Sequence, residues 1–364
     1  MMGRPASARP ALPHAPEALT PEWLTAALRS GGASADAAVT SVAWESTGDQ
    51  GWTTRMARLT LTYGRAGDGM PATLVAKFSA PDAGTRRFFR RFYEREVFFY
   101  RVIASLVPLR TPRCYYADYD PSAQAHVLLL EDMAPAVAGN MGSGVSVEVA
   151  LEYTCRIAEL HAQWWESPAL DALLVRFPVP GAGFARGYTE RFEAGIRAMS
   201  PYLDHVTRSL AARLQGGLQE RWRRQSTAPR TLIHWDAHAA NFMLPSANGG
   251  PFTVLDWQNW TVARGIWDVA RFCTLSLPIA ERRAVEREVV ARYTDTLARL
   301  GVRHYPLAQA MADYRDAMPL QFAQQLRFFG SMQHGDETRR AWVAAVMPRV
   351  VAALQDAAVA GSLG

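Results

Sequence analysis

The sequence predicts an α+β fold with two lobes, a small N-terminal lobe built on an antiparallel sheet and a larger, mainly helical C-terminal lobe. Strand-like alternation of apolar and polar residues recurs between residues 42 and 133, with one helix inserted. Beyond the Gly-rich segment "AGNMGSGV" the pattern becomes mostly helical. Because 364 residues suffice for one large or two medium domains, we place the lobe boundary near residues 132–145. The lobes are then residues 18–135 and 136–364.

The N-terminal segment is expected to be a disordered tail followed by a short helix. Residues 1–17 are rich in Pro and Ala and contain no apolar run of signal-peptide length, so no export is predicted. The stretch "LTPEWLTAALRSGG" then predicts a helix, with Thr20 as N-cap, Pro21 in the first turn and Gly31 with Gly32 as the stop.

Three predicted strands follow this helix. They are "VAWE", "TTRMARLTLTY" and "ATLVAKF", and their alternation fits an antiparallel meander. The first connection, "STGDQGW", contains Gly48 and Gly51. Two further strands are expected in "RCYYADYD" and "HVLLLEDM", on either side of a turn at Asp120-Pro121.

The helix predicted over residues 86–105 carries a carboxylate on its apolar face. At about 100° per residue, Glu96 falls among the aromatic and aliphatic side chains, while Glu94 lies on the opposite face. Burying an unpaired ion costs several kcal/mol, which leaves two interpretations. Either Glu96 pairs with Lys77 of the preceding strand, or it reaches solvent at the edge of a shorter helix.

The stretch "TLIHWDAHAANFML", residues 231–244, concentrates polar side chains in an apolar context. "FML" and "FTVL", separated by "PSANGGP", predict a β-hairpin, so Asp236 and Asn241 precede it and Asp256 follows it at the same edge. Asp236 is suited to accept the proton of an attacking hydroxyl, and Asn241 and Asp256 offer hard oxygen ligands for Mg²⁺ on nucleotide phosphates. His234 would orient the loop. These features predict phosphoryl transfer.

In the order of these motifs, the chain resembles the aminoglycoside phosphotransferase and choline kinase-like group of the protein-kinase-like superfamily, in particular its ecdysteroid kinase-like branch. The resemblance covers roughly residues 20 to 300. "VLDWQ" resembles the "IDFQ" or "IDW" of the group, and "RIAELHAQWW" resembles its "LAxLHA" helix. "HWD" stands where "HGD" is usual, and we expect Trp235 to pack rather than to narrow the acceptor side.

The resemblance implies a two-lobed protein-kinase-like fold and ATP- and Mg²⁺-dependent transfer of the γ-phosphoryl group to a hydroxyl of a small molecule, such as an alcohol, sugar, sterol or antibiotic. Asp236 would be the catalytic base, and Asn241 and Asp256 would hold magnesium. The nucleotide-binding residues would be Lys77 and Glu96 at the α- and β-phosphates, Ser46, Gly48 and Gly51 in the loop over the phosphates, and the backbone of Glu131 and Met133 at adenine. Asp268 would support the catalytic loop.

Two other functions stay open at this point. A metallohydrolase would use His234, Asp236 and His238, although the eight histidines form no second cluster. A nucleotide-binding pseudokinase would keep the site without turnover. Other conspicuous side chains are expected to be structural, namely His161 and the tryptophans Trp257, Trp260 and Trp267.

Composition narrows the partners and the location. The net charge of +5 and the arginine runs at residues 86–91 and 221–224 occur without a nucleic-acid-binding motif, so we expect solvated helix faces and no nucleic acid. Three isolated cysteines indicate a reducing, cytoplasmic setting. The apolar segment 341–361 is interrupted by Pro348 and Arg349, which favours a packed helix over a membrane span. The sequence does not specify the oligomeric state.

Overall fold

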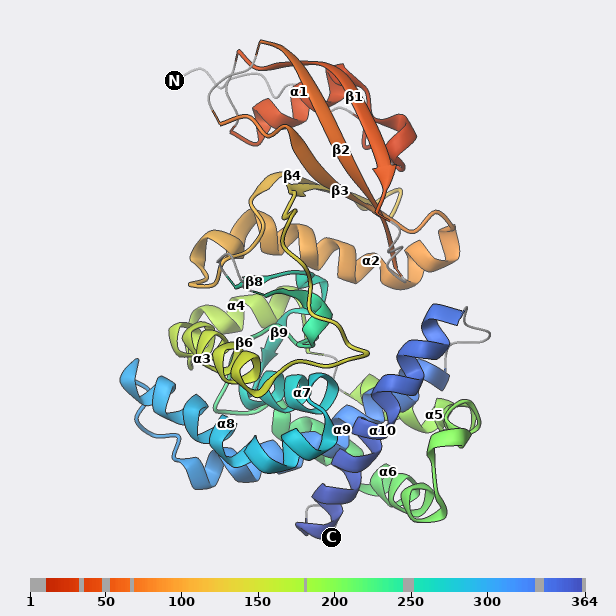
Figure 1. Ribbon diagram of the computed structural model, residues 1–364, viewed down its shortest axis with the longest axis vertical. Helices are drawn as coiled ribbons and strands as arrows, with labels where there is room; N and C mark the ends of the chain where they lie inside the picture. Colours follow the sequence, from red (N-terminus) through yellow and green to blue (C-terminus); the bar gives the residue numbers. More distant parts are fainter. Residues whose placement is uncertain are drawn as a thin grey trace. The chain divides into compact units, whose positions relative to one another are not determined.

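The computed structural model describes residues 11–32, 36–47, 53–65, 69–179, 182–244, 252–330 and 337–361. The chain folds into two compact units (Figure 1). The N-terminal unit consists of Met1–Leu106, Thr111–Pro135 and Asp256–Gln258, and the C-terminal unit consists of Val107–Arg110, Ala136–Leu255 and Asn259–Gly364. A short segment after the predicted hairpin therefore belongs to the N-terminal unit.

The N-terminal unit contains a five-stranded antiparallel sheet in the order β1-β2-β3-β5-β4. The strands are β1 (Ala38–Ser46), β2 (Thr54–Arg65), β3 (Thr73–Ser79), β4 (Cys114–Asp120) and β5 (Ala125–Glu131). This arrangement confirms the predicted meander and the additional strand pair. The central position of β3 places Lys77 between Met56 of β2 and Leu128 of β5.

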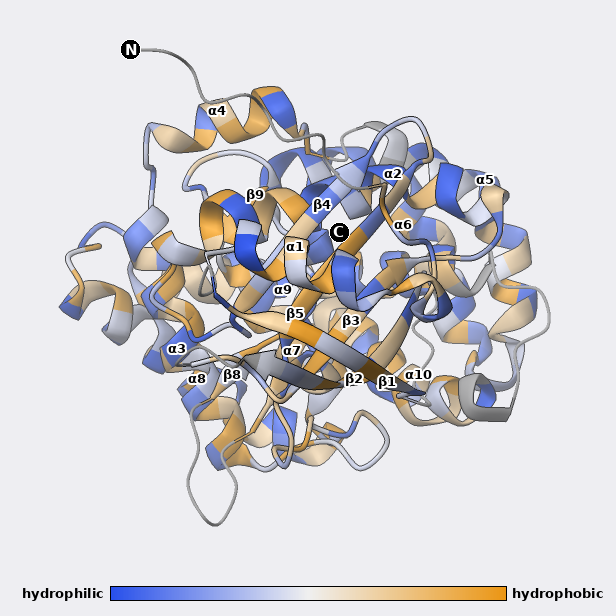
Figure 2. Cartoon of the chain, turned by 90° about the horizontal axis from the view of Figure 1, so that it is seen from above, coloured by the Kyte–Doolittle hydropathy of each residue, from blue (hydrophilic) through white to orange (hydrophobic). Residues whose placement is uncertain are grey.

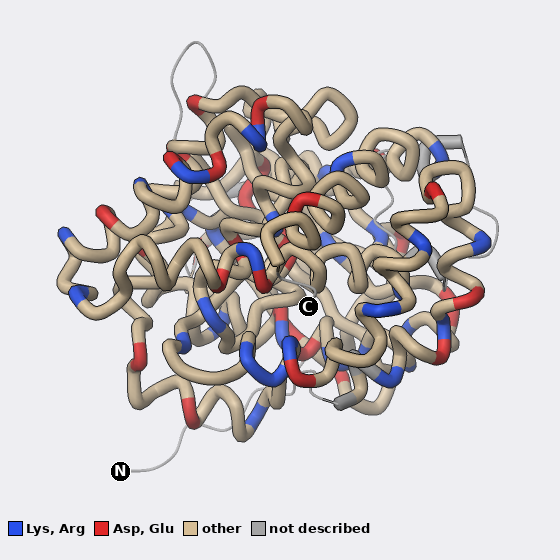
Figure 3. Tube along the Cα trace, turned by 90° about the horizontal axis from the view of Figure 1, so that it is seen from below, with Lys and Arg blue, Asp and Glu red and all other residues tan. Residues whose placement is uncertain are grey.

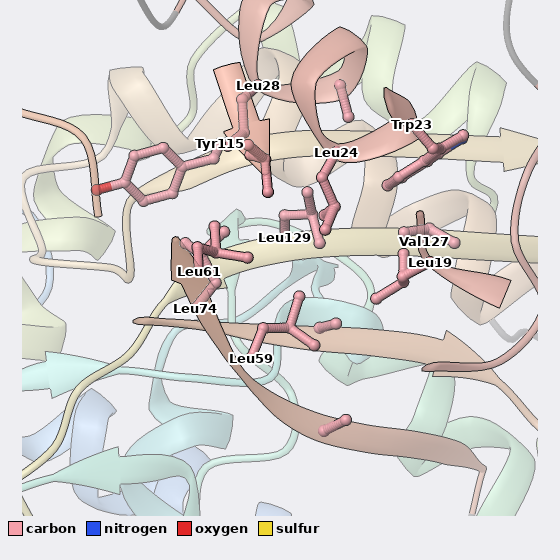
Figure 4. Close-up of a cluster of buried hydrophobic side chains, with 14 of the residues drawn as sticks. Leu19, Trp23, Leu24, Leu28, Leu59, Leu61, Leu74, Tyr115, Val127 and Leu129 are labelled. Atoms are coloured by element: carbon pink, nitrogen blue, oxygen red, sulfur yellow. The ribbon is translucent and has the colours of Figure 1, made fainter. Parts of the chain in front are cut away.

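One face of this sheet is covered by α1 (Pro21–Ser30), which begins as predicted at Thr20, whose hydroxyl accepts a 3.1 Å hydrogen bond from the Trp23 amide. Figure 4 shows the resulting core, in which Leu24 and Leu28 lie above apolar side chains of the strands. Part of the expected tail belongs to this unit, because the Ala11 carbonyl accepts a hydrogen bond from the Trp23 indole and Pro16–Ala18 form a 3₁₀ turn. Residues 11–17 are thus structured, and residues 1–10 lie outside the described part.

The opposite face of the sheet is covered by α2 (Ala83–Phe98), which continues through a π-helical turn at Phe99–Ile103. Side chains alternate between the two faces of a strand. Leu74 and Ala76 therefore join the α1 core, whereas Lys77 points toward α2. β5 is apolar along most of its length (Figure 2), and its residues from Ala125 to Leu130 are buried.

The C-terminal unit is mainly helical, as predicted. Its helices are α3 (Val147–Trp164), α4 (Ala169–Arg176), α5 (Ala182–Ala198), α6 (His205–Gln225), α7 (Ile266–Ser276), α8 (Ile279–Arg299), α9 (Leu307–Gly330) and α10 (Glu337–Val359). Every residue of α7 is buried, which makes it the central helix of the unit.

Two short strand pairs interrupt these helices. β6 (Thr231–Ile233) pairs with β9 (Thr261–Ala263), and β7 (Phe242–Met243) pairs with β8 (Thr253–Val254). The β7-β8 pair confirms the predicted hairpin, whose connection at residues 245–251 lies outside the described residues.

The apolar segment near the C-terminus is the helix α10. Its residues Arg340–Val359 are the one stretch in the described chain that is long and apolar enough to cross a bilayer, and half of it is buried in the structure. Arg349 donates hydrogen bonds of 2.8 and 2.9 Å to the carbonyls of Met141 and Leu275, so a residue that interrupts the apolar run ties this helix to its unit. Acidic and basic residues are interspersed along the described chain (Figure 3).

Candidate active site

A buried ion-pair cluster lies in the N-terminal unit. The Lys77 ammonium donates hydrogen bonds of 2.7 Å to Glu96 Oε1 and 2.7 Å to Asp256 Oδ1. Lys77 is 5% exposed and Glu96 is 0% exposed. The prediction that Glu96 pairs with Lys77 is confirmed, and the alternative in which Glu96 reaches solvent is wrong. Lys77 is also the only lysine in the sequence.

The oppositely charged groups in this cluster stabilise one another in their ionised forms. Burial by itself lowers the pKa of Lys77, but the carboxylates of Asp256 and Glu96 outweigh it and raise the pKa above its usual value. Burial likewise raises the pKa of Glu96, but Lys77 and then His126 reverse that effect and lower it. Lys77 and Glu96 are therefore ionised at neutral pH, and removing either one would leave a buried charge.

His126, on β5, is a member of this cluster that the sequence did not indicate. Its Nδ1 lies 2.8 Å from the Ser79 hydroxyl, its Nε2 lies 3.7 Å from Glu96 Oε2, and its ring stacks on Tyr93. Burial lowers the pKa of His126 despite the nearby Glu96 carboxylate. Within an apolar strand the residue has no sequence pattern that marks it, because its partners come from β3 and α2.

This environment predicts a pH-dependent contribution to stability. The folded pKa of His126 lies below the unfolded value of about 6.5, so the unfolded chain binds a proton that the folded chain excludes. The free energy of unfolding should fall as the pH drops below that value. His126→Asn should weaken this dependence between pH 7 and pH 5, as measured by urea unfolding. The same change at His205, which is exposed on α6, is the control, and equal slopes for wild type and His126→Asn would contradict the prediction.

The segment around Asp256 is held by its two successors. The Gln258 amide donates a 3.0 Å hydrogen bond to Asp256 Oδ2, and the Thr53 hydroxyl donates to Gln258 Oε1 at 3.3 Å. Trp257 stacks on Phe99 with ring centroids 4.1 Å apart. Asp256 itself has a φ of 55°, a left-handed conformation that Asp tolerates better than most residues. These contacts fix the carboxylate beside Lys77.

The second cluster lies in the C-terminal unit and centres on Asp236. Arg271 of α7 donates from Nε at 3.1 Å and from Nη2 at 2.5 Å to Asp236 Oδ1, and the Asn259 amide donates to Oδ2 at 3.3 Å. Burial by itself raises the pKa of Asp236, but Arg271 outweighs it and lowers the pKa to about 2. The Asp236 side chain, which is 21% exposed, is therefore an accessible carboxylate at neutral pH. No sequence pattern had indicated Arg271.

The loop that carries Asp236 is anchored by Asp268, as the resemblance implied. Its two carboxylate oxygens accept hydrogen bonds from the backbone amides of His234, at 2.7 Å, and Trp235, at 2.8 Å. The Asn241 amide group donates to the Asp236 carbonyl at 2.8 Å. His234 Nε2 lies 2.8 Å from the Leu255 carbonyl, so His234 fixes the loop, as predicted.

Trp235 occupies a backbone position that favours glycine. Its φ is 73°, in the left-handed region where a side chain costs free energy and glycine does not. The indole is buried, stacks on Trp267 at 4.4 Å and contacts Trp222 edge-on. The prediction that Trp235 packs is confirmed, and aromatic burial compensates for the strained backbone.

The histidine and the three tryptophans that were expected to be structural are all buried. His161 is fully buried, with Nδ1 2.9 Å from the Tyr293 hydroxyl and Nε2 3.4 Å from Asp268. Trp257, Trp260 and Trp267 are at most 1% exposed.

The predicted nucleotide residues at the sheet's ends are only partly described. Ser46 is exposed at the end of β1, and Gly48 and Gly51 lie outside the described residues. The Glu131 amide already donates to the Arg113 carbonyl at 2.8 Å, so this amide is engaged in the sheet rather than presented to a ligand. Met133 is the second residue after the end of β5.

The metallohydrolase interpretation gains no support. Among the described residues no group of three or more His, Cys, Asp and Glu side chains is arranged to hold a metal ion. His238 lies 3.8 Å from Asp236, while His234 is turned to the Leu255 carbonyl.

Comparison with known proteins agrees with this geometry. A family model described as "Phosphotransferase enzyme family" matches residues 50–305. The comparison with curated proteins gave no significant match.

Among solved structures, choline kinase from Cryptosporidium parvum is 8% identical, with a TM-score of 0.53, and the match covers 88% of this chain and 91% of that chain. Ethanolamine kinase from Plasmodium vivax is 12% identical, with a TM-score of 0.51 and coverage of 86% and 81%. A GDP complex of aminoglycoside 2′-phosphotransferase-IIIa is 14% identical, with a TM-score of 0.52 and coverage of 94% and 98%.

At these identities the structural likeness establishes the fold, which is the two-lobed protein-kinase-like fold. The ecdysteroid kinase-like branch stays a prediction. Because the family model spans well over half of the sequence, the chain belongs to the phosphotransferase enzyme family and is a small-molecule kinase.

Proposed function

We propose that this kinase uses ATP and Mg²⁺ to transfer the γ-phosphoryl group to a hydroxyl of a small molecule in the cytoplasm. The observation that carries the proposal is the buried Lys77, paired at 2.7 Å with both Glu96 and Asp256. A strand lysine held by a helix glutamate is the arrangement that positions the phosphates of a nucleotide. Lys77 would exchange its contact with Asp256 for phosphate oxygens and keep its contact with Glu96.

The residues proposed for magnesium fit this ion. The Asp256 carboxylate and the Asn241 amide oxygen are hard oxygen ligands, and Mg²⁺ commonly takes only one or two protein ligands besides phosphates and water. The nitrogen of the Asn241 amide donates to the Asp236 carbonyl, which leaves the oxygen end of the amide for a cation. When bound, the ion would neutralise charge on the phosphates.

Asp236 would orient the acceptor hydroxyl and receive its proton. With a pKa of about 2, this carboxylate is too weak a base to deprotonate an alcohol before phosphoryl transfer begins. Its role is therefore to hold the hydroxyl in line and to take the proton late, as a loose phosphoryl-transfer transition state allows.

The remaining assignments follow the sequence. Ser46, Gly48 and Gly51 would cover the phosphates, and the backbone near Glu131 and Met133 would meet adenine, with the engaged Glu131 amide shifting that role toward Met133. The names of the structural neighbours include choline, ethanolamine and aminoglycoside, which are all hydroxyl compounds, and this supports a hydroxyl acceptor here.

The test is ADP formation over a panel of hydroxyl acceptors, including sugars, sterols, macrolides, choline-type alcohols and aminoglycosides, with ATP and Mg²⁺. Asp236→Ala serves as the blank. We expect acceptor-dependent ADP formation that the blank lacks and that chelation of Mg²⁺ abolishes. Binding of ATP without any turnover above the blank, over the whole panel, would contradict the proposal and favour a pseudokinase.

A further inference from the structure

We propose that Arg271 is a positioning residue that also sets the acceptor class, because it cancels the charge of Asp236 and so directs the site toward uncharged hydroxyl compounds rather than cationic amines. The inference rests on the proposed function. It concerns the C-terminal unit alone and goes beyond the family assignment, which leaves the acceptor open.

Arg271 is fixed from two sides. Its Nε and Nη2 donate to Asp236 Oδ1, and its Nη1 donates to Gln321 Oε1 of α9 at 3.2 Å. Arg271 is 4% exposed and Gln321 is 0% exposed, and α7 is buried along its whole length. A guanidinium committed on three nitrogens is a rigid donor, so Gln321, Arg271 and Asp236 form a chain of contacts from α9 through α7 to the loop.

This chain of contacts selects one oxygen of Asp236 for the acceptor. Both bonds from Arg271 go to Oδ1, whereas the one bond that Oδ2 accepts from the described residues is the longer bond of 3.3 Å from Asn259. Oδ2 is therefore the oxygen that an incoming hydroxyl would meet. Loss of Arg271 would let the carboxylate rotate, and small errors in position are costly in phosphoryl transfer.

The same pairing removes the charge that would attract a cation. A carboxylate and a guanidinium in contact carry no net charge, and desolvating an ammonium group beside them is unfavourable. The other buried acidic residues in the described part of this unit also have partners. Asp313 pairs with Arg264 at 2.5 Å, and Asp268 accepts hydrogen bonds from backbone amides.

The charged residues buried in the described part of the C-terminal unit are mostly cationic. They comprise four arginines and two aspartates: Arg221, Arg271, Arg282, Arg349, Asp268 and Asp313. Beyond Gln321 on α9, Arg327 lies close to Arg191 of α5. Both side chains pack beside Gly187, where any larger residue would contact them. Arg221 and Arg282 are neutralised by Asp316 and Asp356. The features that would disfavour a cationic acceptor are therefore the neutralised Asp236 and the close approach of Arg327 to Arg191.

The experiment measures ADP formation with glucose, myo-inositol and uridine as uncharged probes and with choline, ethanolamine and kanamycin as cationic probes, relative to hydrolysis of ATP in water. We expect at least one uncharged probe to stimulate turnover about 10-fold or more and the cations to give none. Arg271→Gln should then lower kcat about 100-fold while KM for ATP changes less than 2-fold, and Arg271→Lys should restore part of kcat.

A second pair of variants guards against loss of folding. Gln321→Leu removes only the support of Arg271 and should lower kcat about 10-fold. The control is Gln325→Leu, a residue one turn further along α9 that is 2% exposed and should leave kcat unchanged.

Stimulation by the cationic probes alone, or by no uncharged probe, would overturn the inference. So would unchanged kcat in both Arg271→Gln and Gln321→Leu. In each of these cases, ATP turnover that is abolished by Asp236→Ala would still uphold the proposed function.

Discussion

Asp236→Asn is expected to lower kcat about 10²- to 10⁴-fold, the range for loss of a positioned proton acceptor. The amide keeps the shape of the side chain but cannot accept a proton from the acceptor hydroxyl. KM for ATP should stay close to that of the wild type, since the predicted nucleotide residues belong to the N-terminal unit.

Steady-state kinetics with the best acceptor found, together with a thermal melt, checks this expectation. Asp204→Asn is the matched control, because Asp204 is an exposed N-cap of α6 and asparagine caps helices equally well. A kcat for Asp236→Asn within 10-fold of the wild type would remove this residue as the proton acceptor.

Lys77→Met is expected to damage both stability and catalysis. It leaves Glu96 fully buried without its strongest cationic partner, and breaking a buried ion pair on one side costs about 3–5 kcal/mol. It also removes the proposed phosphate contact, so kcat/KM for ATP should fall about 100-fold or more. Urea unfolding and steady-state kinetics measure the two effects separately.

The double variant Lys77→Met with Glu96→Leu separates these effects. Replacing a whole buried ion pair by apolar side chains is often neutral or stabilising, so most of the lost stability should return while activity does not. Recovery of activity together with stability would show that Lys77 serves the fold alone. Failure to recover stability would instead point to the other partners of the cluster, His126 and Asp256.

Local sequence patterns and the order of the motifs were enough to predict part of the site. Glu96 stood out because a carboxylate on an apolar helix face needs a partner, and Lys77 lay on the strand just before it. The hairpin of β7 and β8 followed from two apolar runs around a turn. Such signals are contained within about 25 residues of sequence.

The features that were not predicted depend on contacts between segments that are far apart in the sequence. Arg271 lies 35 residues from Asp236, and Gln321 lies 50 residues beyond Arg271, with no pattern that links them. Whether an arginine on a buried helix meets a carboxylate depends on helix packing, which one sequence does not reveal. The positive φ of Trp235 was hidden for the same reason, because the aromatic contacts that stabilise it come from α6 and α7. The ordering of residues 11–17 likewise depends on Trp23 of α1.

The single lysine gives the molecule an unusual chemical simplicity. Lys77 is the only lysine, and the other residues counted with it as Lys or Arg are all arginines. The chain therefore has one side-chain amine, besides the amino group at the N-terminus, that can react with acylating, reductively alkylating or crosslinking reagents. That amine is buried and held protonated by two carboxylates, and a protonated amine is not a nucleophile. Loss of the ion pairs around Lys77 would therefore change its reactivity toward such reagents. Under the proposed function, a nucleotide that draws the amine away from Asp256 would have this effect.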